Sequence, residues 1–284
     1  MMIGMRTSAK ILKKCRKKNF IMSLLLVSAV TLSAQHTKEY VAHDVHLRTA
    51  IELYQQEKYA AAADELQHSR SLDVLDEAQQ LEADFYVAAT AYHRRQANAL
   101  EFISNQLTWH PYSNHSSQLH LMAGVLLIET GRPGNLRSAV GHLHAVDVKG
   151  LSKDERKDHL YYEGVALCKT SKPVEAQRRF AQLLETPTKY DLSATYYYAY
   201  CLYAQKKYAE AIAPFSRVED VADYRSTAPY YLCQCYYALG QNEQAAKRAR
   251  TLLKKYPENE NNGELNRILA DISYQQNDYD AAIA

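Results

Sequence analysis

Glycine and proline are scarce in this sequence, with nine glycines and seven prolines among 284 residues. Proteins built from many short strands need frequent tight turns, and tight turns favour these two residues. Their scarcity argues against an all-β fold and favours helices. Tryptophan (one) and phenylalanine (five) are also rare, whereas tyrosine occurs 23 times. Because tyrosine combines a large apolar ring with a polar hydroxyl, it suits half-buried positions and contact surfaces.

Acidic residues are absent from the first 34 residues, which carry seven basic ones: Arg6, Lys10, Lys13, Lys14, Arg16, Lys17 and Lys18. Removing these seven from the chain's 34 basic residues leaves 27 against 32 acidic ones, a net charge of −5. A mildly acidic body lacks the basic surface that nucleic-acid binding requires. We therefore expect no nucleic-acid partner.

The basic N-terminal stretch runs into an apolar segment, residues 20–32, and then into the small residues Ser33 and Ala34. This order is typical of a secretory signal peptide. The apolar segment is shorter than the ~20 residues that span a bilayer, although an uncleaved signal anchor is an alternative. We expect a signal peptide at residues 1–34, cleaved near Ala34, then a short lead at 35–45 and a periplasmic protein. Lipid attachment is not expected, because no cysteine follows the apolar segment.

The rest of the chain repeats itself. Residues 196–215 read as an aromatic run, a short polar turn, and then Ala211 and Phe215 four residues apart. Residues 47–66 and 230–245 follow a similar order, and Pro257 closes the latter copy. The small residue that opens each second half recurs at intervals of 34 to 40 residues, at Ala62, Ala99, Ala139, Ala176, Ala211, Ala245 and Ala282.

This pattern resembles the tetratricopeptide repeat, whose unit is a helix–turn–helix of about 34 residues. The resemblance covers residues 46–284 as about seven copies, the third with an enlarged turn at residues 130–135 and the last incomplete. It implies an all-α, right-handed superhelical solenoid, because a single helix pair cannot bury its apolar face alone and neighbouring copies stack. Small residues are expected where the paired helices approach closely: Ala50, Ala88, Gly124, Gly164, Ala199, Cys233 and Ala270.

In the tetratricopeptide family the first helices of each pair line a groove that holds partners. Three residues before each small position lie Leu47, Phe85, Leu121, Tyr161, Tyr196, Tyr230 and Arg267. Four residues after it lie Tyr54, Tyr92, Ile128, Cys168, Tyr203, Tyr237 and Tyr274. The two offsets differ by seven residues, so both columns share one helix face. We expect a partner-binding groove at Tyr54, Phe85, Tyr92, Tyr161, Tyr196, Tyr203, Tyr230, Tyr237 and Tyr274. The alternative is that these rings only pack one helix against another.

Other chemistry-bearing residues do not form a catalytic or metal-binding motif. Cys168, Cys201, Cys233 and Cys235 fall within expected helices, so buried thiols are favoured over the disulfides that export permits. The histidine-rich stretch around the third copy, which includes the His142–His144 pair, lacks an acidic or cysteine partner at ligand spacing. No phosphate-binding or nucleophile motif occurs. We therefore expect no enzyme activity, no metal and no cofactor.

The sequence predicts a periplasmic scaffold that binds other proteins or peptides, in envelope or outer-membrane protein assembly. It would meet the membrane only through export or an envelope complex. The Ser33-Ala34-Gln35 exit is reminiscent of exported Bacteroidetes proteins. Two alternatives remain: a glycan- or lipid-binding module, and the N-terminal targeting part of a longer protein with a catalytic domain after residue 284.

Overall fold

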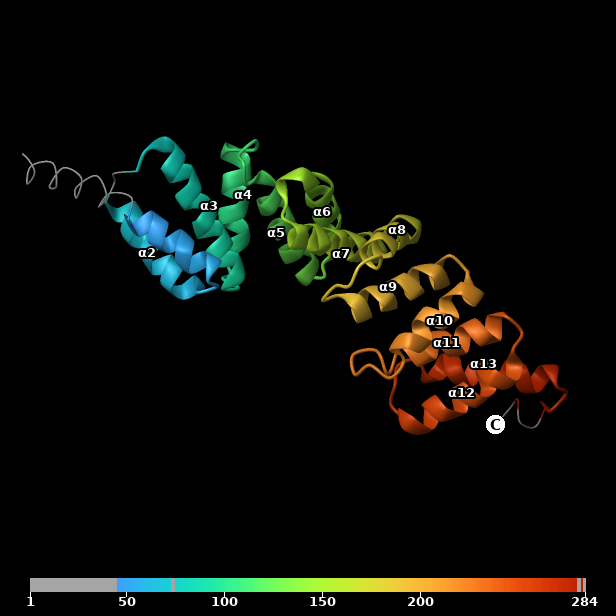
Figure 1. Ribbon diagram of the computed structural model, residues 1–284. Helices are drawn as coiled ribbons and strands as arrows, with labels where there is room; N and C mark the ends of the chain where they lie inside the picture. The colour runs from blue at the N-terminus through green and yellow to red at the C-terminus, as the bar shows by residue number, and fades with distance from the viewer. Residues whose placement is uncertain (1–44, 73–74, 280–281, 283–284) are drawn as a thin grey trace, which may run out of the picture. The chain divides into compact units, whose positions relative to one another are not determined.

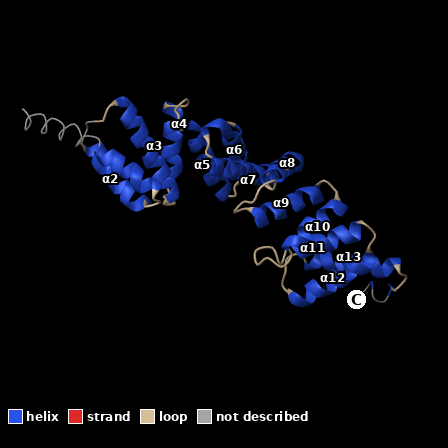
Figure 2. Ribbon diagram, viewed as in Figure 1, coloured by secondary structure: helices blue, strands red, loops and turns tan. Residues whose placement is uncertain are grey.

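Helices and the turns between them make up the described part of the chain. The computed structural model describes residues 45–72, 75–279 and 282, in which no strand is found (Figures 1 and 2). The expected signal peptide, most of the lead that follows it and Ile283 of the last copy lie outside these residues. None of the helices described combines the length and apolar character needed to cross a bilayer.

The chain divides into two compact units, residues 1–102 and 103–284. Unit 1 contains a helix at residues 45–55, α2 (Tyr59–Ser71) and α3 (Glu77–His93). The boundary falls within α4 (Ala99–Trp109). Unit 2 contains α5 (Ser116–Glu129), α6 (Pro133–His144), the short 3₁₀ helix η1 (Val148–Gly150), α7 (Lys153–Lys169), α8 (Pro173–Leu183), α9 (Asp191–Ala204), α10 (Tyr208–Val218), α11 (Ala228–Ala238), α12 (Asn242–Lys255) and α13 (Asn262–Gln275).

Consecutive helices of unit 2 pack against one another from α5 to α13, and first helices of neighbouring copies also touch, α5 with α7, α7 with α9 and α9 with α11. A helix that contacts both its pair partner and the next copy is the arrangement of stacked helix–turn–helix repeats. The predicted fold class, an all-α solenoid of such repeats, is confirmed.

The first helix of every copy ends at a residue with a left-handed backbone conformation. The residue seven positions after each small residue has a positive φ, between 55° and 73°, in all seven copies: Glu57, Arg95, Gly131, Ser171, Lys206, Gly240 and Asn277. In the fifth copy the Lys206 N–H donates to the Tyr203 carbonyl at 2.8 Å, and the Lys207 N–H donates to the Leu202 carbonyl at 3.0 Å. These two bonds form a Schellman motif, which satisfies carbonyls at the helix end and reverses the chain.

The expected close approach of paired helices is also confirmed. A Cβ atom added to Gly164 in α7 would lie 2.8 Å from the Phe180 ring of α8, and one added to Gly124 would lie 2.6 Å from Leu143 Cγ. Phe180, Phe215, Leu66 and Leu143 are all fully buried, as expected of residues that fill the space between helices.

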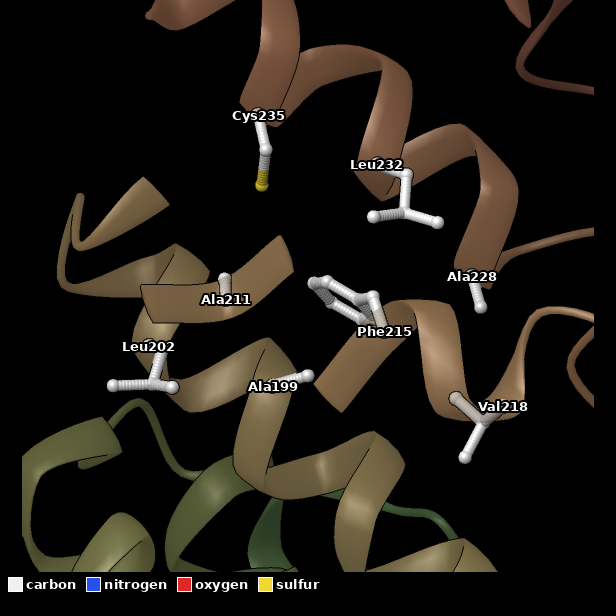
Figure 3. Packing of buried hydrophobic residues seen from close by; sticks show 8 residues of the cluster. All are labelled: Ala199, Leu202, Ala211, Phe215, Val218, Ala228, Leu232 and Cys235. Atoms are coloured by element: carbon white, nitrogen blue, oxygen red, sulfur yellow. The ribbon is translucent and has the colours of Figure 1, made fainter. Parts of the chain in front are cut away.

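A representative core lies where α9, α10 and α11 meet (Figure 3). The Phe215 ring projects from α10 toward Ala199 of α9 and Ala228 and Leu232 of α11, and Ala211 lies beside it. All of these side chains are inaccessible to solvent. Two consecutive copies therefore share one core, which fixes the spacing between the first helices α9 and α11.

Candidate functional site

The predicted groove residues of unit 2 become more exposed toward the C-terminus. At the N-terminal side, Leu121 and Ile128 are buried in α5. Tyr161, Tyr196, Tyr203, Tyr230 and Tyr237 are half-buried in α7, α9 and α11. In α13, Arg267 is exposed and Tyr274 is 66% exposed. Within unit 2, an accessible surface of tyrosines is thus built by the last copies and not by the copy that contains α5.

Two of the predicted tyrosines have a ring face covered by tyrosines of the turns between copies. Tyr161 stacks on Tyr190 with centroids 3.9 Å apart, and Tyr196 stacks on Tyr224 at 4.3 Å. The same two copies each contain a second stack, Phe180 on Tyr197 and Phe215 on Tyr231. The resulting aromatic tetrads are Tyr161, Phe180, Tyr190 and Tyr197, and Tyr196, Phe215, Tyr224 and Tyr231. For Tyr161 and Tyr196 the structure favours the packing alternative.

Tyr203 and Tyr237, which lie four residues after the small residue of their copies, instead form hydrogen bonds to the next copy through their hydroxyls. Tyr203 of α9 donates to the Gln234 side-chain oxygen of α11, and Gln234 Nε2 donates to the Tyr230 hydroxyl at 2.5 Å. One copy later, Tyr237 donates to Asp271 Oδ2 of α13 at 3.0 Å, and Arg267 donates to the same oxygen at 2.8 Å. Two consecutive copies repeat one hydrogen-bonding scheme.

The centre of each scheme was not predicted. Gln234 and Asp271 each lie one residue after the small position, between the two predicted columns. Position alone would have found this middle column, because on a helix it shares the face of residues three before and four after the small residue. We call Tyr203, Tyr230, Gln234, Tyr237, Arg267, Asp271 and Tyr274 the tyrosine surface.

Burial raises the pKa of three hydroxyls of this surface, those of Tyr203, Tyr230 and Tyr237. It raises the pKa of Tyr203 to about 12, with a further contribution from nearby Tyr230. Burial also raises the pKa of Tyr230 and of Tyr237, and for Tyr237 the hydrogen bond to Asp271 adds to the effect. At neutral pH these hydroxyls therefore act as donors and acceptors and carry no charge.

The predicted residues of unit 1 form a separate aromatic cluster. Tyr54 and Tyr92 are half-buried, and the Tyr54 hydroxyl lies 3.1 Å from His93 Nε2. His93 also stacks on Tyr59, with ring centroids 4.3 Å apart. Phe85 is 4% exposed. The expectation that Phe85 lines an open surface is therefore wrong; as a purely apolar ring it is packed among neighbouring side chains.

The histidines around the third copy are engaged with other side chains. His120 Nδ1 lies 3.0 Å from His142 Nδ1, whereas His144 Nε2 lies 3.3 Å from a carboxylate oxygen of Glu163. His142 and His144 thus diverge, as their spacing predicts. Glu163 is 1% exposed and pairs with Arg179, whose Nε lies 2.6 Å from Oε2. Across the described residues, no group of three or more histidine, cysteine or acidic side chains is placed to hold a metal ion.

Tetratricopeptide repeat models match residues 161–224 and 202–261, the segment that carries both aromatic tetrads. No curated protein sequence matches the chain significantly. Similar solved structures share the fold at low identity. PilF of Pseudomonas aeruginosa is 17% identical with a TM-score of 0.53, over 78% of this chain and 96% of PilF.

A repeat-containing protein from Cytophaga hutchinsonii, solved as its C-terminal part, is 16% identical with a TM-score of 0.51, over 81% of this chain and 90% of that one. PilW, described as a widely conserved type IV pilus biogenesis factor, is 13% identical with a TM-score of 0.50, over 79% of this chain and 98% of PilW. Residues 161–261 are therefore tetratricopeptide repeats, and the copies outside this segment share their backbone register.

Proposed function

We propose that this protein is an exported scaffold that binds segments of other proteins on the tyrosine surface of α9, α11 and α13. The observation that carries the proposal is the repeated hydrogen-bonding scheme, in which Tyr203 and Tyr237 each bond to the middle column of the next copy. It presents half-buried rings at the spacing of the repeat. A partner in extended or helical form can contact several rings at once.

The chemistry of the surface suits a protein partner. Tyrosine and arginine are enriched at protein interfaces and among the residues that dominate binding energy. Asp271 and Arg267 bring charges of both signs to the end of the surface, so polar groups of a partner find donors and acceptors there. Family members generally serve as non-catalytic scaffolds, and the proposal includes no catalytic step.

We extend the proposal to the bacterial envelope. The basic and apolar N-terminal segment supports export to the periplasm. One protein with a similar fold, PilW, is described as a pilus biogenesis factor. Together these favour a role in assembling envelope or outer-membrane proteins.

Binding is tested with a partner captured in the native host by cross-linking and then purified. Tyr237→Ala and Tyr274→Ala are expected to weaken its affinity by roughly 30-fold, which corresponds to ~2 kcal/mol for an interface anchor. Melting temperature should change little for Tyr274→Ala, because the ring is already 66% exposed.

Tyr196→Ala is the matched control. Its ring is stacked within the core tetrad, so its loss should lower the melting temperature and leave affinity nearly unchanged at a temperature where the variant is folded. If Tyr203→Ala and Tyr237→Ala lower the melting temperature sharply and do not affect affinity, the tyrosine surface is packing and the proposal fails.

Export is tested by fractionation of the native host and sequencing of the mature N-terminus. The protein should be periplasmic and begin near Gln35. A cytoplasmic protein that retains residues 1–34 would contradict this part of the proposal.

A further inference from the structure

A pocket with a charged rim lies between α11, α12 and the turn that joins α10 to α11. Its volume is about 450 Å³, inside the range of roughly 300–1,000 Å³ that is typical of ligand sites. Its floor is apolar and aromatic, formed by Pro229, Tyr236, Leu252 and Tyr256. The charged residues that line it are Glu219, Asp220, Arg225, Lys247, Arg248 and Lys255.

The positive charge at this pocket comes mainly from α12. The helix carries five basic residues and one acidic residue, a net charge of +4. The chain after residue 34 has 27 basic and 32 acidic residues, a net charge of −5. The basic character of α12 is therefore a local feature of an otherwise acidic body.

Contacts within the pocket hold two of its cations against aromatic rings. Arg248 Nη1 lies 2.6 Å from Glu219 Oε2, and the guanidinium carbon of Arg248 lies 5.3 Å from the centre of the Tyr236 ring. Lys255 Nζ lies 5.3 Å from the centre of the Tyr256 ring. Because Glu219 neutralises Arg248, the charges left for a ligand are those of four exposed side chains, a net of +2: Arg225, Lys247 and Lys255 against Asp220.

The spacing of the two lysines indicates the shape of the ligand. Lys247 and Lys255 are eight residues apart on α12, which is about 12 Å along the helix axis. Thr251 lies midway between them on the same face and also lines the pocket. In an extended peptide, side chains four residues apart point the same way and are roughly 13 Å apart. An extended chain with two acidic side chains therefore matches both the net charge and the length of the pocket.

We propose that this pocket binds an acidic segment of a partner protein in extended conformation. Carboxylates at positions i and i+4 of the segment pair with Lys247 and Lys255. An apolar side chain at position i+2 faces the same way and packs on the floor beside Tyr236 and Leu252. The argument for a peptide is charge complementarity at both ends of an apolar pocket.

This site is separate from the tyrosine surface. Pro229 and Tyr236 are seven residues apart and share a face of α11. That face is turned by about 100° from the face of Tyr230 and Tyr237, which precede or follow them by one residue. A segment bound in the pocket leaves the tyrosine surface free, so this proposal does not depend on the proposed function.

The test uses protein purified from the native host and a peptide acetylated and amidated at its ends, Ser-Glu-Ser-Leu-Ser-Glu-Ser. Isothermal titration calorimetry at low ionic strength should show saturable binding that weakens at high salt. Lys247→Ala and Lys255→Ala should each weaken it by about threefold, since exposed ion pairs contribute modestly. Lys254→Ala is the matched control, because this exposed lysine of α12 does not line the pocket, and it should have almost no effect.

Charge reversal gives a second readout that loss of folding cannot imitate. The double variant Lys247→Glu, Lys255→Glu alters exposed side chains only. It should reject the acidic peptide and bind Ser-Lys-Ser-Leu-Ser-Lys-Ser, which the natural protein should not bind. Failure of this exchange would overturn the proposal.

Two further outcomes would also refute it. Equal weakening by Lys254→Ala, or equal binding of a peptide whose two glutamates are adjacent, would indicate only general attraction to α12. The other is an absence of peptide binding together with binding to vesicles of phosphatidylserine and phosphatidylcholine that Lys247→Ala and Lys255→Ala remove. That result would assign the pocket to lipid headgroups.

Discussion

At the residue scale, the position that ends each first helix has the same backbone conformation in all seven copies but not the same residue. Gly131 and Gly240 adopt the left-handed conformation without a side-chain penalty, whereas five copies place a side chain there. For an L-residue this conformation costs roughly 1–2 kcal/mol. The five non-glycine residues therefore store strain in the folded state.

Lys206→Gly should raise the free energy of unfolding by about 0.5–1 kcal/mol, because relief of the strain exceeds the entropy that glycine adds to the unfolded chain. Gly240→Ala should lower it by about 1 kcal/mol, although the new Cβ would meet no atom within 4 Å. Urea unfolding followed by circular dichroism measures both. A neutral Gly240→Ala would mean that the turn relaxes to another conformation.

A second prediction concerns the buried carboxylate of Glu163. Arg179→Ala removes its closest partner and leaves a charge at a side chain that is 2% exposed. Breaking a buried ion pair from one side costs about 3–5 kcal/mol; because Arg179 is 41% exposed, we expect a loss nearer ~2–3 kcal/mol. Arg217→Ala, which breaks the exposed pair with Asp191, is the control and should cost less than ~1 kcal/mol. Equal effects in thermal unfolding would argue against a buried pair.

At the element scale, the helix pairs depend on small residues at the point of closest approach. Gly164→Ala places a Cβ 2.8 Å from the Phe180 ring, which is itself fully buried and stacked on Tyr197. The ring cannot move freely, so we expect overpacking to cost about 1–3 kcal/mol. Gly141→Ala in α6 is the matched control, since no atom lies within 4 Å and alanine favours a helix by roughly 0.5–1 kcal/mol. In urea unfolding, Gly164→Ala should lower the free energy of unfolding and Gly141→Ala should raise it. A stabilising Gly164→Ala would show that α7 and α8 separate easily.

The helices and their pairing could be predicted from sequence because they depend on local spacing. Gly164, Ala199 and Cys233 recur at nearly constant intervals, and each fixes a first helix, a turn and a second helix. The enlarged turn expected at residues 130–135 is wrong, because only residues 130–132 separate α5 from α6, as three residues separate α7 from α8. The extra residues of the third copy lie between α6 and α7, at 145–152, where η1 forms.

The candidate site was predictable only in part, because its character depends on contacts between copies. The tyrosine columns were recognised, but Tyr190 and Tyr224 lie in turns of irregular sequence, and nothing local indicates that they cover Tyr161 and Tyr196. Glu163 was missed for a related reason. Its partners are contributed by α6 and α8, and from sequence alone a single charged residue in a helix is expected to face solvent.

At the scale of the whole molecule, stability should fall as the pH drops below neutrality. Burial lowers the pKa of His93, His120 and His142 below the ordinary value of 6.5; Arg95 adds to the effect at His93, and His142 at His120. The unfolded chain therefore binds protons at a higher pH than the folded protein does, and stability rises with pH through this window. The stability that these histidines contribute is fully present above about pH 6.5, and it is lost as the pH falls toward their lowered pKa values in the folded protein.

The melting temperature should therefore decrease between pH 7.5 and pH 5.5. His142→Gln should reduce that decrease, since it removes one of the two rings whose Nδ1 atoms lie 3.0 Å apart. The ion pair between Glu264 and Arg267 does not interfere, because Arg267 lowers the Glu264 pKa and its contribution is lost only in more acidic solution. A melting temperature that rises on acidification would contradict the assignment.

The aromatic tetrads imply that the copies of unit 2 are not equally coupled. Stacked rings add about 0.5–1.5 kcal/mol per pair beyond their buried area, and the tetrads join α7 and α8 to α9, and α9 and α10 to α11. At the next junction Ala249 and Ile268 stand in place of the phenylalanine and tyrosine. In a chain of nearest-neighbour couplings, opening begins where the coupling is weakest, so amide hydrogens of α13 should exchange with solvent much sooner than those of α9. A partner bound across α11 and α13 would have to stabilise α13. Its binding would therefore slow amide hydrogen exchange in that helix, although the partner contacts the helix through only a few residues.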